Sequence, residues 1–175
     1  MNDQLVQISA RLNALEAERD ITDTINRYSH AIDYGLDDDW LDCFTVDGSI
    51  EVRSTDRQVT PDGTGSPPPT REGRYTGRQQ LLGFIHAQSR PPDAWHKHVV
   101  SQTRIRLDAE SATAISYLIR VDESAGRLRL YSMGRYIDTL VRSIDGRWRI
   151  AERIVDVELV SPAPDGPHKA GSSPG

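Results

Sequence analysis

Two histidines at the start of a strand-like segment are well suited to acid–base chemistry. They occur in the run Trp95-His96-Lys97-His98, and His98 leads directly into Val99 and Val100. An imidazole titrates near neutral pH, so a histidine that points into an apolar interior is a natural general base. Such a base needs an acidic partner to orient its ring, and our candidate is Asp33, far upstream in the chain.

Other interpretations of these residues stay open at this point. Asp33 could cap the turn at Gly35, and His98 could be a core histidine that is bonded to a backbone carbonyl. His30 lies about one helical turn before Asp33 and is a rival partner for it. His96 shares a strand face with His98, and we interpret it as a rim residue that faces substrate. The two histidines predict no metal site, because no third ligand has a clear spacing from them.

The composition is that of an ordinary soluble globular protein with one domain. The chain has 175 residues, of which 37% are hydrophobic and 27% are charged. Its net charge of -5 and its lack of a basic cluster argue against nucleic-acid binding. No apolar run has the length of a membrane span, and the N-terminus lacks the pattern of a signal peptide, so we expect a cytoplasmic protein. The single cysteine, Cys43, excludes an internal disulfide.

Hydrophobic periodicity predicts helices first and strands last. Apolar residues recur at steps of three and four over residues 2–32, with an interruption at Arg19-Asp20 where a bend or a second helix could begin. Gly35 is well placed to end this helix, and Asp37-Asp38-Asp39 is expected to cap a short one. A third helix is predicted over 77–89. The predicted strands cover 49–53, 98–107, 112–121, 128–144 and 147–160.

These elements predict a single domain over residues 1–160. Residues 54–76 are rich in proline and glycine and are expected to form an irregular loop, and 161–175 are interpreted as a disordered tail. Helices followed mainly by antiparallel strands indicate the α+β class. We expect a cone-shaped α+β barrel, in which a curved mixed or antiparallel sheet wraps around the long N-terminal helix and encloses an apolar pocket.

Several short motifs, taken in order, resemble a known family. They are Tyr-Ser-His-Ala-Ile-Asp at 28–33, Lys-His-Val-Val-Ser at 97–101, Tyr-Ile-Asp at 136–138 and Asp-Gly-Arg-Trp-Arg-Ile at 145–150, followed by Arg153. Together they resemble the SnoaL-like branch of the nuclear transport factor 2-like superfamily, which includes scytalone dehydratase, the bile-acid 7α-dehydratase and a dehydrochlorinase. The resemblance covers residues 15–160.

The resemblance implies a set of site residues. By position, Asp33 and His98 correspond to the catalytic histidine–aspartate dyad of those three enzymes. Tyr28 and Arg153 match further site residues and are expected to donate hydrogen bonds where charge develops on a substrate. Tyr28 could instead be a packing residue, and Arg153 could bridge to Asp138 or Asp156. The residues expected to contact substrate are His96, Trp40, Tyr136 and Trp148, and the two tryptophans could instead be core residues.

The resemblance also implies a function, with alternatives. We expect a lyase that needs no cofactor, in which the dyad removes a proton and drives β-elimination on a hydrophobic polycyclic molecule of steroid or polyketide type. The same base could serve an isomerase or a polyketide cyclase. A non-catalytic binding protein and a dioxygenase β-subunit belong to the same superfamily. Related dehydratases are trimers, so we expect a homo-oligomer, with a trimer favoured over a dimer.

Overall fold

The structure is a computed structural model that describes residues 2–54, 72–124 and 126–160. The expected tail at 161–175 lies outside the described residues. None of the helices in the described ranges is long and apolar enough to cross a membrane. The elements, in chain order, are α1 Asn2–Tyr34, α2 Asp37–Asp42, β1 Phe44–Ser54, β2 Gly73–Thr76, α3 Gly77–His86, β3 His96–Asp108, β4 Ser111–Ser124, β5 Arg127–Arg142 and β6 Trp148–Val160.

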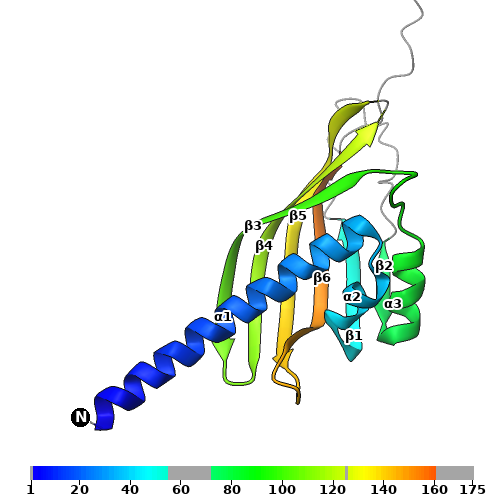
Figure 1. Cartoon of the computed structure of the whole chain (residues 1–175). Coiled ribbons are helices and arrows are strands. Elements are labelled where there is room, and N and C mark those ends of the chain that lie inside the picture. Colours follow the sequence, from blue (N-terminus) through cyan, green and yellow to red (C-terminus); the bar gives the residue numbers. More distant parts are fainter. Residues whose placement is uncertain (1, 55–71, 125, 161–175) are drawn as a thin grey trace, which may run out of the picture.

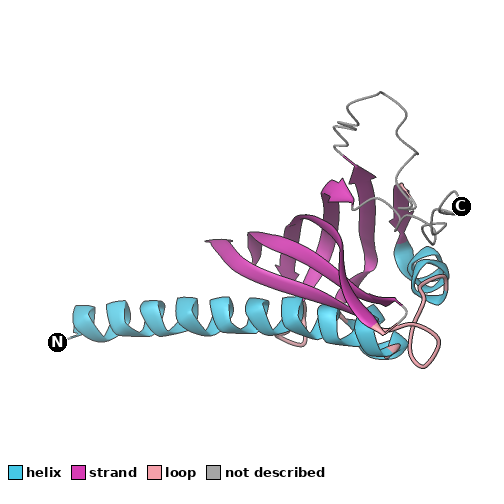
Figure 2. Ribbon diagram, turned by 90° about the horizontal axis from the view of Figure 1, so that it is seen from above, coloured by secondary structure: helices cyan, strands magenta, loops and turns pink. Residues whose placement is uncertain are grey.

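The strands form one mixed sheet that curves over α1. Its order is β2-β1-β6-β5-β4-β3, so β2 and β3 are the two edges. Strand β1 runs parallel to β6, and the other neighbouring strands are antiparallel. Helix α1 crosses one face of the sheet, and the sheet arches over it without closing (Figures 1 and 2). The predicted α+β class and the curved sheet around a long N-terminal helix are confirmed.

Helix α1 is continuous from Asn2 to Tyr34, so no second helix begins at Arg19-Asp20. Its C-terminal half packs against the sheet, and Thr24 on this half donates a hydrogen bond to the carbonyl of Trp148 at 2.8 Å. Gly35 has a φ of +68° and ends the helix as predicted. No side chain caps α2, so its acidic residues lie in its first turn without the expected cap. The buried residues on this half of α1 include Ile21, Ile25, Tyr28, Ala31 and Ile32.

One strand was missed in the segment predicted to be irregular. Strand β2 pairs antiparallel with β1 across four residue positions and precedes α3 directly. It has only four residues, which is too short for an alternating pattern to be recognised in the sequence. The remainder of the predicted loop, residues 55–71, lies outside the described residues.

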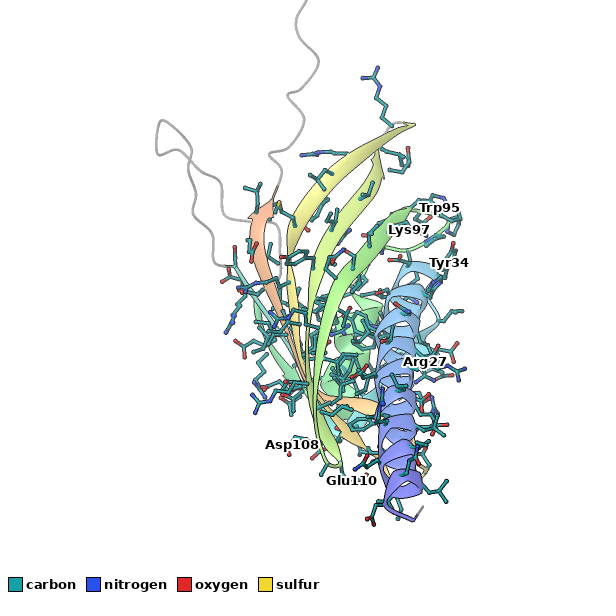
Figure 3. All side chains as sticks on the ribbon, turned by 90° about the vertical axis from the view of Figure 1, so that its left-hand side faces the viewer. Arg27, Tyr34, Trp95, Lys97, Asp108 and Glu110 are labelled. Atoms are coloured by element: carbon teal, nitrogen blue, oxygen red, sulfur yellow. The ribbon has the colours of Figure 1, made fainter. Side chains whose placement is uncertain are left out.

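Strand β3 is an edge strand that lies beside α1. It has a bulge between Ser101 and Arg104, where Gln102 adopts a φ of 53° and the strand bends. In Figure 3, Trp95 and Lys97 lie beside Tyr34 at the C-terminal end of α1, while the other end of β3 lies towards the helix N-terminus. The Lys97 Nζ is 4.1 Å from the centre of the Tyr34 ring. The start of β3 therefore meets the end of α1.

Candidate active site

Asp33 and His98 form a hydrogen-bonded pair where α1 and β3 meet. The Asp33 Oδ1 lies 2.6 Å from the His98 Nδ1. The backbone N–H of His98 also donates to the same carboxylate, with distances of 3.0 Å to Oδ2 and 3.3 Å to Oδ1. The predicted pairing of these two residues is thus present. The rival partner, His30, is exposed to solvent.

The fold explains why a carboxylate is stable at this position. Because β3 is an edge strand, some of its backbone N–H groups have no neighbouring strand to bond. Asp33 accepts a bond from one of them, at His98. A buried aspartate in the last turn of a helix faces the negative end of the helix dipole, which disfavours its charge. The three bonds from His98 offset that cost.

The electrostatics of the pair determine how His98 is protonated. Burial alone would raise the pKa of Asp33, but the hydrogen bonds from His98 outweigh burial, so this pKa lies below its ordinary value. An ionised carboxylate can only accept hydrogen bonds. The neutral imidazole must therefore carry its proton on Nδ1, and Nε2 keeps a free lone pair. Such a ring is a base whose free nitrogen points away from Asp33.

His98 borders a cavity of about 240 Å³ beneath the curved sheet. Since Nδ1 is bonded to Asp33, Nε2 is the ring nitrogen available to a molecule in this cavity. Both apolar and polar side chains line it. They are Tyr28, Ile32, Val52, Phe84, Ala87, Gln88, Ser89, His98, Leu118, Arg120, Tyr131, Ser132, Tyr136, Val155 and Val157.

A row of polar residues across three strands includes His98 and was not predicted. His98 pairs with Arg120 on β4, and Arg120 pairs with Ser132 on β5. All three line the cavity. The Arg120 guanidinium is held by two bonds to Asp122, at 2.7 and 3.1 Å, and lies 4.6 Å from the centre of the Tyr131 ring. Arg120 is therefore a fixed, charged donor in the same row as the candidate base.

Arg153 is placed differently from the expectation that it donates to substrate. It is fully buried, and its Nε and Nη2 each lie 2.7 Å from a carboxylate oxygen of Asp138. Its guanidinium lies between two tyrosine rings, 3.9 Å from the centre of Tyr28 and 4.1 Å from that of Tyr136. It is not among the residues that line the cavity. The alternative interpretation, a bridge to Asp138, is the one observed, and Asp156 instead pairs with Arg53 and Arg135.

The two tyrosines that flank Arg153 present neutral phenols to the cavity. Burial raises the pKa of Tyr28, against the opposing influence of Arg153. Burial likewise raises the pKa of Tyr136 well above its ordinary value. Burial would lower the pKa of Arg153, but Asp138 raises it, so the guanidinium stays charged. Arg153 therefore contacts two tyrosines that line the cavity and does not line it itself.

His96 is buried, and the expectation that it lies at the rim is wrong. Its Nε2 is 3.6 Å from the Asp33 Oδ1, which is too long for a hydrogen bond, and its ring meets that of His98 edge to face at 5.2 Å. Its Nδ1 has no hydrogen-bond partner among the described residues. Burial, followed by the nearby charge of Arg120, lowers the pKa of His96 to about 4. His96 is therefore a neutral second histidine behind the pair.

The position of His96 predicts a fall in stability at mildly acidic pH. In the unfolded chain its pKa is about 6.5, so between roughly pH 6.5 and 4 the unfolded state binds more protons and is favoured. We expect the free energy of unfolding to fall by on the order of 2 kcal/mol across this window. Urea unfolding of wild type and His96→Gln at pH 7 and pH 4.5 measures the difference.

The control for this measurement is His30→Gln, because His30 is exposed on the same helix as Asp33. It should keep the wild-type dependence on pH, while His96→Gln should flatten it. The stability that the ionised Asp33 contributes is lost only below about pH 4, so Asp33 does not affect the measurement in this window. Equal slopes in wild type and His96→Gln would show that His96 is not the group responsible.

Of the four residues expected to contact substrate, only Tyr136 lines the cavity. Trp40 is fully buried and stacks on Phe84 with ring centres 5.8 Å apart. Trp148 is buried at the start of β6 and borders a separate hollow next to Ala17. Both tryptophans belong to the core, as the second interpretation had it, and neither lines this cavity.

The fold also supplies the third potential metal ligand that the sequence spacing did not reveal. Ligand atoms of Asp33, His96 and His98 lie within 4.8 Å of one another. Metal–ligand bonds of about 2.0–2.2 Å in tetrahedral geometry hold neighbouring donor atoms more than about 3 Å apart. The 2.6 Å separation of Asp33 and His98 is shorter than this and is that of a direct hydrogen bond. The geometry fits a proton between them.

Comparison with known proteins identifies the same fold. The sequence model of the SnoaL-like domain family matches residues 13–154. No curated protein matches the chain. An NTF2-like protein with a cystatin-like fold from Novosphingobium aromaticivorans is 19% identical with a TM-score of 0.67, covering 86% of this chain and 87% of that one.

Two further solved structures are similar at the level of the fold. The β subunit of a putative aromatic-ring-hydroxylating dioxygenase from Novosphingobium aromaticivorans is 18% identical, with a TM-score of 0.67, and the match covers 86% of this chain and 94% of that one. ActVI-ORFA from Streptomyces coelicolor is 16% identical, with a TM-score of 0.64, and the match covers 81% and 97% of the two chains.

Proposed function

The chain belongs to the family of SnoaL-like domains within the nuclear transport factor 2-like superfamily, and from that premise we propose that it is a cofactor-independent lyase. The observation that carries the proposal is the 2.6 Å bond between Asp33 and His98 beside a cavity. That bond makes His98 Nε2 a base aimed at whatever the cavity holds. Asp33 then stabilises the imidazolium that forms when His98 takes a proton.

In the proposed reaction His98 removes a proton from the carbon next to a substrate carbonyl. The electrons of that C–H bond form a C=C bond, and a β-hydroxyl leaves as water by taking up the proton that the His98 imidazolium gives back, which restores the neutral base. Negative charge develops on the carbonyl oxygen before the hydroxyl departs. Tyr28 and Arg120 line the cavity and can donate hydrogen bonds to that oxygen and to the leaving group. These roles need no cofactor.

The cavity supports a substrate smaller than a steroid. Pockets for drug-sized ligands measure about 300–1,000 Å³, and this one measures about 240 Å³. We therefore infer a compact molecule of one or two rings, with a carbonyl directed at the polar row of His98, Arg120 and Ser132. Apolar residues such as Ile32, Leu118 and Val157 would contact its ring carbons.

The tautomer of His98 tests the proposal without a substrate. Ring ¹⁵N chemical shifts should show the neutral His98 protonated on Nδ1 in the wild type. In Asp33→Asn the amide can donate to Nδ1, so the proton should move to Nε2. Asp39→Asn, which alters an exposed aspartate nearby, should leave the wild-type tautomer. An Nε2-protonated ring in the wild type would remove the base from the proposal.

Isomerisation and cyclisation use the same base and are the nearest alternatives. Turnover in D₂O separates the three reactions by mass. Elimination yields a product lighter by one water, whereas an isomerase returns a product of unchanged formula that carries solvent deuterium at a new carbon. An aldol-type cyclisation keeps the formula and joins two carbons of the substrate.

A non-catalytic role is the other candidate, and the structural similarity to a dioxygenase β subunit is what favours it. It predicts that the chain purifies together with an iron–sulfur α subunit. It also predicts ligand binding that is indifferent to His98→Ala, with no product formed. Either result would count against a lyase.

A further inference from the structure

The first half of α1 has an apolar stripe that nothing in the described part of the chain covers. Leu5, Ile8, Leu12 and Leu15 are 61%, 54%, 53% and 63% exposed. Figure 2 shows these turns of α1 extending beyond the sheet. The four residues, which we call the N-terminal stripe, are spaced three, four and three apart. That spacing is the a and d pattern of a coiled coil over two heptads.

The N-terminal stripe points away from the core face of α1, and its last residue, Leu15, borders a hollow beside Thr103 and Ile105 of β3. With about 100° per residue, its mean direction differs by roughly 150° from that of the core residues Ile21, Ile25, Tyr28 and Ile32. The next a and d positions are the polar residues Arg19 and Thr22. The stripe thus ends where the core face begins, so one helix has two apolar faces for two separate contacts.

We propose that the N-terminal stripe packs against the same stripe of further copies of this chain in a parallel coiled coil. The charges flanking the stripe support this partner and this direction. In the heptad that starts at Leu5, Arg11 is at position g and Glu16 is at position e. Parallel helices bring position g close to the following e of the neighbour, so Arg11 would pair with Glu16 of the partner subunit.

An antiparallel arrangement fits the charges less well. With Leu5 opposite Leu15 and Ile8 opposite Leu12 of a second helix, Arg11 would lie opposite another Arg11. The parallel pairing also has a natural end, because Glu18 at the next g position would meet Asp23 of the neighbouring helix, and the two would repel. The contact is therefore confined to the first two heptads.

Two heptads suffice here because the helix is already formed. An isolated helix of this length is marginal, since its first turn is costly to nucleate. In this chain residues 21–34 are packed against the sheet and nucleate α1, so association has only to bury the stripe. The pairing leaves each cavity with its own chain, because the α1 residues that line the cavity, Tyr28 and Ile32, lie in the other half of the helix.

Sedimentation of the full chain tests the proposal. We expect the wild type to be a dimer or trimer and Leu12→Glu to weaken association by on the order of a hundredfold, with an unchanged circular dichroism spectrum. The control is Tyr117→Glu, which places the same charge on the outer face of the sheet, where Tyr117 is 57% exposed. A monomeric wild type, or dissociation by Tyr117→Glu but not by Leu12→Glu, would overturn the proposal.

A charge exchange tests the direction. Arg11→Glu and Glu16→Arg should each weaken association by about tenfold, because each creates like-charged pairs across the coiled coil. The double variant Arg11→Glu/Glu16→Arg should restore wild-type association. Failure of the double variant to recover would show that the helices do not pair in this register.

Discussion

Asp33→Asn should lower turnover by about four orders of magnitude while leaving the fold intact, on the scale known for a histidine held in the wrong tautomer. The side-chain carbonyl of the asparagine can still accept the His98 backbone N–H, so the junction of α1 and β3 is kept. Its amide group would face Nδ1 as a donor, and the proton of His98 would move to Nε2. The ring then has no free nitrogen in the cavity. The measurement is kcat on the first substrate that reacts, with thermal unfolding as the check on folding.

The matched variants for this prediction are His98→Gln and the double variant Asp33→Asn/His98→Gln. If the two residues act as one unit, the double variant should lose little more activity than His98→Gln alone. Losses that multiply would instead show that Asp33 and His98 act independently. Near-wild-type turnover by Asp33→Asn would exclude the dyad as the base and leave the binding-protein alternative.

The sequence allowed the pair to be predicted for reasons that do not extend to the rest of the site. His98 stands at the start of an alternating strand and Asp33 at the end of a periodic helix, and the topology brings the two ends together. Ser116, Leu118 and Arg120 are every second residue of β4 and share its inward face, so a strict period of two predicts that Arg120 points inward. Its charge argued for the solvent face, and no sequence pattern shows that Asp122 neutralises it.

The sequence analysis misplaced His96 and Arg153 because alternation along a strand tells which face a side chain is on but not whether it reaches the cavity. His96 and His98 share a face, as predicted, but His96 lies behind Asp33 whereas His98 reaches the cavity. Arg153 was expected to donate to a substrate from the same sheet. Because it pairs in register with Asp138 on β5, its charge is satisfied within the sheet itself. The pairing register of β5 and β6 sets Asp138 opposite Arg153, and that register depends on the packing of the whole sheet.

Asp138→Asn should be among the most destabilising single changes in the chain. Arg153 and Asp138 are both fully buried, and an asparagine leaves the guanidinium charged in an apolar layer between Tyr28 and Tyr136. Removing one partner of such a pair typically costs about 3–5 kcal/mol, because the other charge remains desolvated. Urea unfolding measures this loss. Asp145→Asn, which breaks an exposed bond to Arg149, should cost far less.

The double variant Asp138→Leu/Arg153→Met separates charge from packing. It removes both charges and roughly conserves volume, so it should recover most of the stability lost in Asp138→Asn. If the double variant stays as unstable as the single one, the loss comes from packing around Tyr28 and Tyr136 and not from an unpaired guanidinium. Where stability returns, turnover should still stay below wild type, because the cation that holds the two phenols beside the cavity is gone. That split between folding and activity is what a positioning role for Arg153 predicts.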